Sequence, residues 1–311
     1  MPKNILIYPH SPGFNSCDGG LTVHYELAKI LKEYNQCVKI YRLSDTCSVN
    51  PIFNDYYNND FPIDDNMVVI YCEGIKGNPL NAKYVVRWML SELGQNVPYD
   101  SLYTWNKNEL VYYFNSEKKL ADNPEKIGNI YKLLSILHLP PEAIQTNFET
   151  RDGVCYTIRK GFLIHKNGIK CIHPENALEL IYNDISRHEY IQVFNKFKYF
   201  VCYDSLSFYI IISALCGCIS IVYPVDGLTK KEWIQTTAVA EYCSVKGLDN
   251  LYGISYGIAD EDIKYAEDTL HLVKEQWDDI IQFNKERYIT PFLQDIENFE
   301  EMQNTIENNF F

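Results

Sequence analysis

The sequence is poor in basic residues. It holds 28 Lys and Arg against 41 Asp and Glu, a formal net charge of -13 at pH 7, and no stretch is dense in Lys or Arg. Surfaces that bind nucleic acid need such positive clusters, because much of their affinity comes from the phosphate backbone. We therefore expect no nucleic-acid partner, and any phosphate ligand must be bound by a few specific basic groups.

Long apolar runs are also missing. No segment reaches the length of about 20 residues that a helix needs to cross a bilayer, and the N-terminal MPKNILIYPH lacks the apolar core of a signal peptide. The ten cysteines form no CxxC pair, and Cys72, Cys202, Cys216 and Cys218 fall inside apolar segments, where thiols act as small hydrophobic groups. These features predict a cytoplasmic protein with free thiols, no integral membrane segment and no zinc.

The chain does have enough apolar material for folded cores. Hydrophobic residues make up 46% and aromatic residues 14% of its 311 positions, and a chain of this length usually forms more than one core. Strand-like and helix-like patterns alternate in both halves, which is typical of parallel α/β layers. The polar stretch TNFETRDG interrupts them. We predict one domain over 1–149 and a second over 150–311, with the last helix, about 294–311, able to pack back on the first domain.

The clearest pattern lies in residues 198–233. The run YFVCY is aromatic and β-branched, as in a buried parallel strand, and the following SFYIIISALC is apolar all round, as in a fully buried helix. Gly217 comes where a helix commonly ends, and ISIVY forms a second strand that stops at Pro224. This order predicts a parallel βαβ unit. In the same half, VCYTIRKG predicts a strand and NALELIYNDI a helix.

The first half predicts a similar layer. NILIY is a strand, and the segment after Gly19-Gly20 has apolar residues at helical spacing. CVKIYRL, MVVIYCEG, LVYYFN and residues 103–105 predict further strands, while NAKYVVRWMLSELG predicts a helix that stops at Gly94. Two α/β halves of similar size favour a cleft between them.

Several polar residues follow strands of the second half, at the edge where parallel sheets bind ligands. Backbone N–H groups there favour an anion such as phosphate, and neighbouring cations would neutralise a diphosphate. The candidates are Asp204, Ser205 and Ser207 after YFVCY, Arg159 and Lys160 after VCYTI, and His173 before Pro174. Each of them, taken singly, can equally be a helix cap, a solvated strand end or a helix start.

The first half offers groups for proton transfer. Gly19 and Gly20, preceded by Asp18, would let the backbone approach a phosphate or a sugar closely, although neither GxGxxG nor a phosphate loop is present. A hydroxyl that attacks must lose its proton to a carboxylate or a histidine. The side chains that can do this are His10, Asp18, His24 and Glu73. His24 belongs to the apolar stripe of the first helix, so we expect it to be packed there.

Together these segments resemble the nucleotide-sugar glycosyltransferases of the GT-B fold. The resemblance is carried by GGLTVHYELAKIL, CEGIKGNPLNAKYVVRWML, YTIRKG and YDSLSFYIIISALCGCISIVYPVDGL, and it covers residues 4 to about 266. It implies an α/β protein of two Rossmann-like domains that face each other across a cleft. The chain also resembles small viral and bacterial transferases that decorate surface glycans.

The resemblance implies a reaction and a role for each candidate. The reaction is transfer of a sugar from a UDP-, GDP- or dTDP-sugar to a hydroxyl of a glycan or glycoconjugate. The implied donor-binding residues are Gly19, Gly20, Arg159, Lys160, His173, Asp204, Ser205 and Ser207, and the implied base of an inverting reaction is Asp18, Glu73 or His10.

The sequence departs from the family at one position. Retaining members often carry a second acidic residue eight positions after the one that Asp204 matches, and Ile212 stands there, so the stereochemistry stays open. No DxD motif follows a strand, and the resemblance implies a metal-independent enzyme without a cofactor. Two alternatives remain: an epimerase of the same architecture that binds a nucleotide sugar, and a non-catalytic binding protein with a decayed transferase site. The sequence leaves the oligomeric state open.

Overall fold

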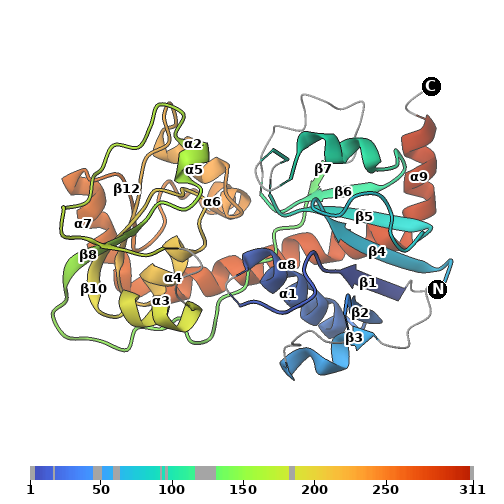
Figure 1. Cartoon of the computed structure of the whole chain (residues 1–311), viewed down its shortest axis with the longest axis horizontal. Helices are drawn as coiled ribbons and strands as arrows, with labels where there is room; N and C mark the ends of the chain where they lie inside the picture. The colour runs from blue at the N-terminus through green and yellow to red at the C-terminus, as the bar shows by residue number, and fades with distance from the viewer. Residues whose placement is uncertain are drawn as a thin grey trace. The chain divides into compact units, whose positions relative to one another are not determined.

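A computed structural model describes residues 4–16, 18–44, 51–58, 64–91, 93–94, 97–115, 131–181 and 186–308. The chain divides into two compact units, which Figure 1 shows in one view: unit 1 is Met1–His138 with Phe283–Phe311, and unit 2 is Leu139–Gln282. Unit 2 starts at Leu139, whereas the sequence predicted a boundary between residues 149 and 150. Hydrogen bonds join the intervening segment to unit 2. Asn195 of unit 2 accepts a hydrogen bond from the Thr146 N–H at 2.7 Å and donates one to the Ile144 carbonyl at 3.1 Å.

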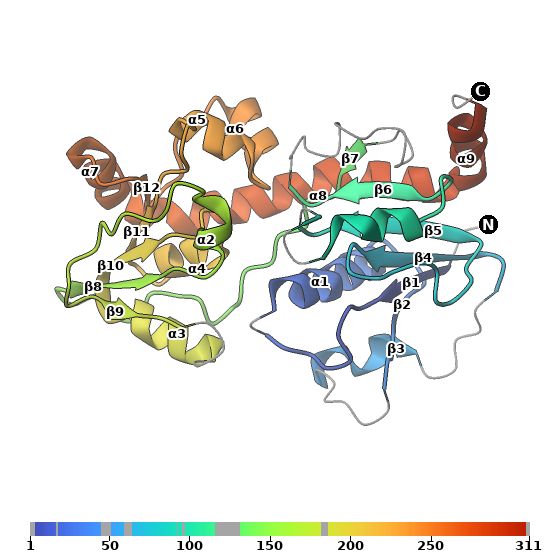
Figure 2. The same ribbon diagram turned by 45° about the horizontal axis from the view of Figure 1, so that its top comes forward.

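Unit 1 contains a seven-stranded sheet in the order β3-β2-β1-β4-β5-β6-β7, and every pairing in it is parallel (Figure 2). The strands are β1 (Asn4–Tyr8), β2 (Val38–Tyr41), β3 (Tyr57–Asn58), β4 (Met67–Cys72), β5 (Tyr84–Met89), β6 (Leu110–Tyr113) and β7 (Tyr131–Leu133). The central strands β4 and β5 are buried on both faces, as expected for a parallel sheet that is covered on both sides.

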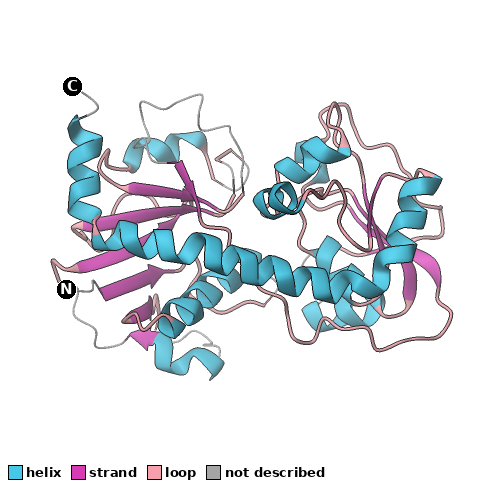
Figure 3. Ribbon diagram, turned by 180° about the vertical axis from the view of Figure 1, so that it is seen from behind, coloured by secondary structure: helices cyan, strands magenta, loops and turns pink. Residues whose placement is uncertain are grey.

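Two helices pack against one face of this sheet. Helix α1 (Gly19–Glu33) and helix α8 (Val273–Glu297) contribute apolar side chains to the same cluster as Ile5 and Ile7 of β1. Figure 3 shows α8 lying across the strands of unit 1. Since unit 1 resumes at Phe283, the return to the first domain begins earlier than the predicted 294. The remaining helices of unit 1 are η1 (Pro51–Tyr56), η2 (Tyr99–Thr104) and α9 (Phe299–Asn308).

Two secondary-structure predictions for unit 1 are wrong. The segment NAKYVVRWMLSELG contains strand β5, not a helix, and residues 103–105 end the 3₁₀ helix η2 instead of forming a strand. The error at β5 has a physical cause. A strand that is buried on both faces shows no alternation of apolar and polar residues, and Arg87 in its centre looked like the polar side of a helix. Arg87 is instead neutralised by buried Glu109, with Nε to Oε2 at 2.6 Å.

Unit 2 contains a five-stranded parallel sheet in the order β12-β11-β10-β8-β9. Its strands are β8 (Asp152–Thr157), β9 (Leu178–Glu179), β10 (Phe197–Cys202), β11 (Ile219–Val222) and β12 (Ile254–Tyr256). Its helices are α2 (Gly161–Ile164), α3 (Arg187–Phe194), α4 (Tyr209–Leu215), α5 (Lys230–Gln235), α6 (Ala240–Lys246), α7 (Asp260–Thr269) and η4 (Leu270–Leu272), and α8 begins in this unit.

The predicted βαβ unit is confirmed as β10, α4 and β11. Gly217 ends α4 with a φ of 86°, the left-handed conformation that glycine adopts without strain. One prediction nearby is wrong. The segment NALELIYNDI contributes the two-residue strand β9 in its described part, and its residues 182–185 lie outside the described residues. Cys72, Cys202, Cys216 and Cys218 are buried free thiols, as predicted.

Each sheet has a point where the strand order reverses. In unit 1 the chain builds outward from β1 on one side and continues from β4 on the other, and in unit 2 the same happens at β8 and β10. Parallel α/β sheets bind ligands at the carboxyl ends of the strands that flank such a reversal. The two units therefore confirm the predicted α/β fold class. Each has one candidate ligand-binding edge, at the carboxyl ends of β1 and β4 in unit 1 and of β8 and β10 in unit 2. The expected cleft between the domains stays a prediction. In the part of the chain that the structure describes, no helix is both long and apolar enough to span a bilayer.

Candidate functional site

In unit 2 the carboxyl ends of β8 and β10 bring together residues that lie far apart in the sequence. The two strands pair in parallel with Thr157 opposite Cys202, so the loops that follow them start side by side. Arg159 donates a hydrogen bond from Nη1 to Ser207 Oγ at 3.3 Å. The structure thus joins the predicted Arg159 and Ser207 directly.

The carboxylate at this edge is Asp204, whose side chain is almost fully buried. Burial raises the pKa of Asp204 above its usual value, and the positive charges of Arg159 and Lys160 oppose this rise. The carboxylate also accepts backbone hydrogen bonds from Leu206 and Lys160. It therefore connects the loop after β10 to the loop after β8, and the two predicted cations are electrostatic neighbours of the predicted carboxylate.

The loop after β8 is held against the end of β10 by two contacts. A Cβ on Gly161 would lie 2.8 Å from the Tyr203 carbonyl oxygen, so only glycine fits there. At the other end of α2, His165 Nε2 lies 2.9 Å from the same carbonyl oxygen. Arg159 itself has a φ of 43°, a left-handed conformation that side-chain-bearing residues adopt at a cost. The position of the loop after β8 is therefore fixed by its contacts with Tyr203.

The guanidinium group of Arg159 also lies over an aromatic ring. Its Cζ is 5.1 Å from the ring centroid of Tyr209, the first residue of α4. The Tyr209 ring stacks on that of Tyr190, with centroids 4.2 Å apart. Sequence reasoning did not assign a role to Tyr209, because nothing in the spacing shows that residues 159 and 209 meet.

The two predicted serines are buried at the same edge. Helix α4 starts at Tyr209, later than expected, and Ser207 Oγ accepts a hydrogen bond from the Tyr209 N–H at 3.3 Å. The carbonyl oxygen of Ser205 accepts a hydrogen bond from Trp233 Nε1 at 3.0 Å. Ser207 therefore contacts both Arg159 and the start of α4, whereas the contact of Ser205 is made by its backbone.

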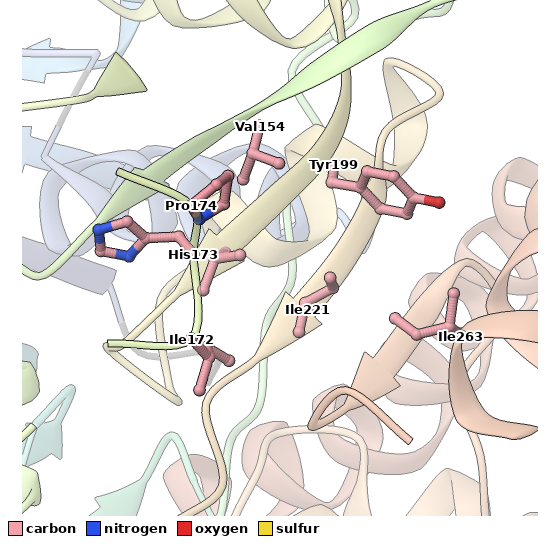
Figure 4. Close-up of a pocket in the computed structure, with 8 residues that line it drawn as sticks. Val154, Ile172, His173, Pro174, Tyr199, Ile221 and Ile263 are labelled. Carbon is pink, nitrogen blue, oxygen red and sulfur yellow. The ribbon is translucent and has the colours of Figure 1, made fainter. Parts of the chain in front are cut away.

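His173 lies at a different place on the sheet of unit 2. Its ring stacks on Tyr156 with centroids 3.7 Å apart, and Nδ1 shares a 2.7 Å hydrogen bond with the Tyr203 hydroxyl group. Figure 4 shows it beside a mainly aliphatic hollow of about 200 Å³. The residues that line this hollow are Val154, Ile172, His173, Pro174, Tyr199, Val201, Ile221 and Ile263. The predicted role of His173 in phosphate binding stays a prediction, since its contacts are with these aromatic and aliphatic groups.

In unit 1 the carboxyl end of β1 and the start of α1 carry an ion pair. His10 Nε2 lies 2.8 Å from Asp18 Oδ2, and both side chains are partly exposed. Asp18 also caps α1, because its Oδ1 accepts a hydrogen bond from the Leu21 N–H at 3.1 Å. Gly20 leaves the space for this pair, since a Cβ there would lie 3.1 Å from His10 Cε1 and 3.3 Å from Asp18 Oδ1. Apart from its chain neighbours and its own helix backbone, none of the described residues lies within 4 Å of the Cβ position of Gly19.

The two members of this pair are charged at neutral pH. Burial lowers the pKa of His10, but hydrogen bonds and charges of Asp18 and Cys72 outweigh burial and raise the pKa to about 10. Burial raises the pKa of Asp18, but the hydrogen bond and the charge of His10 outweigh it, so the net pKa is lowered. The neighbouring Cys72 was not recognised from the sequence as part of this group.

Behind the pair lies His24, which is fully buried as predicted. Its ring centroid is 6.0 Å from that of His10 and 5.5 Å from that of Trp88, which it meets edge to face. Neither ring nitrogen has a hydrogen-bond partner among the described residues. Burial and the charge of His10 lower the pKa of His24 to about 3, so this side chain is neutral.

Glu73 follows β4 at the same edge and is engaged by the next strand. Its Oε2 accepts a hydrogen bond from the Leu90 N–H at 2.9 Å, and its Oε1 accepts one from Ser91 Oγ at 2.7 Å. The buried Glu73 side chain therefore joins the end of β4 to the end of β5, and its predicted role as a base stays a prediction.

Comparison with known proteins finds similarity to solved structures only. No protein-family model and no curated protein matches it. Among solved structures, it is similar to T4 phage BGT in complex with UDP-glucose, at 11% identity over 98% of each chain with a TM-score of 0.43. It is also similar to T4 phage BGT with UDP and Mn²⁺, at 10% identity over 99% of each chain with a TM-score of 0.40. A third neighbour is described as the DNA-modifying enzyme β-glucosyltransferase, at 10% identity and a TM-score of 0.41.

These neighbours are glycosyltransferases, the class that the sequence resembles. The identities and TM-scores are low, so these similarities by themselves assign no function to this chain. One of the neighbours is described as a DNA-modifying enzyme. The expected absence of a nucleic-acid partner for this chain stays a prediction.

The expectation of a reaction without a cofactor is contradicted, since one neighbour was solved with UDP together with Mn²⁺. The reasoning failed because a divalent cation can be held largely by the phosphates of a substrate, which leaves no dedicated motif in the sequence. In the ranges that the structure describes, no three His, Cys, Asp or Glu side chains gather as a metal site.

Proposed function

We propose that the chain is a glycosyltransferase that takes its sugar from a nucleoside diphosphate sugar, and that unit 2 binds the donor. The observation that carries this proposal is the meeting of Arg159, Lys160, Asp204 and Ser207 at the strand-order reversal of the unit 2 sheet. Two cations beside buried hydrogen-bonding groups suit a diphosphate, because guanidinium and ammonium groups make strong charge-assisted hydrogen bonds to phosphate oxygens.

The same groups suit the chemistry of sugar transfer. The bond between the anomeric carbon and the diphosphate oxygen breaks, and both of its electrons stay with the diphosphate. A new bond forms between the anomeric carbon and the acceptor oxygen. Arg159 and Lys160 would stabilise the charge that develops on the leaving diphosphate, a contribution that is largest where water is excluded. Asp204 would accept hydrogen bonds from hydroxyl groups of the donor.

Unit 1 would supply the group that accepts the proton of the attacking hydroxyl. We assign this role to the pair of Asp18 and His10, because both of its side chains are partly exposed, whereas Glu73 is buried. At neutral pH the proton of the pair resides on His10, so the ionised Asp18 is the acceptor and His10 orients it. If instead His10 were the acceptor, kcat/KM would rise with pH up to about 10, where His10 loses its proton.

Donor binding by the full-length protein tests the first part of this proposal. Isothermal titration with UDP-, GDP- and dTDP-sugars, each with and without a divalent cation, should give binding to at least one donor. The Arg159→Ala/Lys160→Ala variant should lose most of that affinity. The matched control is Lys264→Ala/Lys274→Ala. It removes two exposed lysines of unit 2, which lie in α7 and α8 and pair with Asp268 and Asp278. No binding by the wild type, or undiminished binding by the site variant, contradicts the proposal.

A turnover assay with the binding donor tests the second part. Nucleoside diphosphate should be released when an acceptor is present and not in its absence. Oligosaccharides and double-stranded DNA should be compared as acceptors, because net charge disfavours DNA while one structural neighbour modifies it. Conversion of the donor sugar without any acceptor would point to an epimerase instead.

A further inference from the structure

One aromatic contact at the edge of unit 2 has no part in the function proposed above. Tyr209 has an exposed fraction of only 4%, yet its ring lies under the guanidinium group of Arg159 at 5.1 Å. A cation this close to a ring face is attracted by the ring quadrupole, and the attraction is strongest where water is excluded. The stacking on Tyr190 at 4.2 Å, together with burial, fixes the orientation of the Tyr209 ring.

The backbone of Arg159 is in a strained conformation, so contacts of its side chain with neighbouring residues are needed to fix the guanidinium group. Its φ of 43° sets it in a turn that most side-chain-bearing residues avoid. Two of its side-chain contacts, to Ser207 Oγ at 3.3 Å and to the Tyr209 ring, come from the loop after β10 and the start of α4. The end of β10 therefore determines where the charge carried by the loop after β8 is presented.

We propose that Tyr209 is a positioning residue for the phosphate-binding arginine of the donor site. The ring holds the planar guanidinium group, so that its N–H groups point along its own plane toward the diphosphate. Tyr209 need not touch the donor. This inference rests on the proposed function, since it deepens the account of how unit 2 would recognise a diphosphate.

The inference makes a specific demand on phosphate affinity. In the full-length protein, Tyr209→Leu should weaken binding of UDP, GDP or dTDP, whichever the wild type binds, by about tenfold, the size expected for a partly desolvated cation–π contact. Tyr209→Phe keeps the ring face and should bind within about twofold of the wild type. Binding of inorganic pyrophosphate should weaken as much as binding of the nucleotide, because the lost interaction concerns the phosphates. Isothermal titration measures all of these.

A double-mutant cycle separates positioning from a general loss of structure. In the Arg159→Ala background, Tyr209→Leu should cause no further loss of affinity, because the interaction partner is already gone. Tyr242→Leu is the matched control, since Tyr242 is a tyrosine of unit 2 with the same exposed fraction of 4% and lies in α6. It should leave the affinity unchanged. Should Tyr209→Leu fail to fold, Tyr209→Met also lacks a ring face, has a flexible side chain that adapts to irregular gaps, and gives the same readout.

The outcomes distinguish this inference from the proposed function. If the wild type binds a nucleoside diphosphate and Tyr209→Leu binds it equally well, the positioning role is refuted and the donor site stands. If the wild type binds pyrophosphate alone and Tyr209→Leu weakens it, the positioning role stands and the assignment of a nucleotide sugar falls. Binding of neither probe by the wild type refutes both.

Discussion

The two strand-order reversals of this protein carry different kinds of chemistry. At the edge of unit 2, buried polar groups surround two cations, and one carboxylate is present to offset them. At the edge of unit 1, His10 and Asp18 pair with each other and stay partly exposed. The first arrangement has an excess of positive charge for an anion, and the second is a neutral pair that can exchange a proton.

This difference shows that the position in the fold does not decide the chemistry by itself. Both edges lie at the carboxyl ends of parallel strands, where fold rules place ligands. Burial and the balance of charges decide which ligand each edge suits. If the comparison is right, changes in unit 1 should alter rate and pH dependence, and changes in unit 2 should alter donor affinity.

The largest effect should come from Asp18→Asn. Removal of the carboxylate that accepts the proton should lower kcat by roughly 10²- to 10⁴-fold, the usual contribution of general base catalysis. Asparagine is as good a helix cap as aspartate, so α1 should keep its start and donor affinity should stay unchanged. Steady-state kinetics together with donor titration measures both quantities. A lower affinity with an unchanged kcat would reverse the roles of the two units.

His24 gives the next largest effect, on stability and not on activity. Its pKa is about 3 in the folded protein, against an ordinary value of 6.5, so below pH 6.5 the unfolded chain takes up a proton that the folded protein cannot. The free energy of unfolding should therefore fall as the pH decreases from 6.5 toward 3. His24→Phe should remove about 3 kcal/mol of this loss at pH 4, since one pKa unit corresponds to about 1.4 kcal/mol. Urea unfolding at pH 4 and pH 7 checks this, and exposed His188→Phe should show no such difference.

Arg159 should have a somewhat smaller effect that is confined to binding. Arg159→Gly should weaken binding of the nucleoside diphosphate by roughly 10- to 100-fold, as expected for loss of a charged hydrogen-bond donor. Glycine also relieves the left-handed backbone at this position, so the melting temperature should not decrease. A calorimetric scan beside the titration separates lost binding from lost folding. Retained affinity in a stable Arg159→Gly protein would show that unit 2 does not bind the donor through this residue.

The smallest effect concerns the alkaline side of the stability profile. The folded pKa of His10 is about 10, raised from 6.5, so its pair with Asp18 stabilises the protein fully below pH 6.5 and loses this effect as the pH rises toward 10. Because the pair is partly exposed, the change should stay below about 1 kcal/mol. Asp18→Asn should flatten the dependence of melting temperature on pH between 7 and 10. An unchanged slope in that variant would mean that the pair does not form in solution.

The parts of the fold that followed from the sequence are those with one dominant local signal. The segment from β10 to β11 combines an apolar strand, an apolar helix and a glycine stop, and the structure confirms all three. Strand β5 carried a conflicting signal, because a buried arginine gave it a polar residue at helical spacing. Only its pairing with Glu109, twenty-two positions away, makes a strand with a buried charge acceptable.

The candidate sites, like the fold, could be predicted only in part from the sequence. The meeting of Arg159 with Ser207 follows from a rule about where parallel strands end, so it needed no knowledge of side-chain contacts. The contacts of Tyr209 with Arg159 and of His24 with His10 depend on how particular side chains pack, and no spacing along the chain encodes them. The rule on the ends of parallel strands therefore predicts where the sites lie, whereas side-chain packing determines which residues contact each other there.

The return of α8 to unit 1 has a consequence for how the protein is made. Unit 2 is one continuous stretch, Leu139–Gln282, whereas the core of unit 1 needs Ile289, Phe292 and Phe299 from the end of the chain. During synthesis from the N-terminus, domains fold as their residues emerge from the ribosome. The second unit can therefore close its core while the first still waits for its last helices, so the half that is translated first is the half that is completed last.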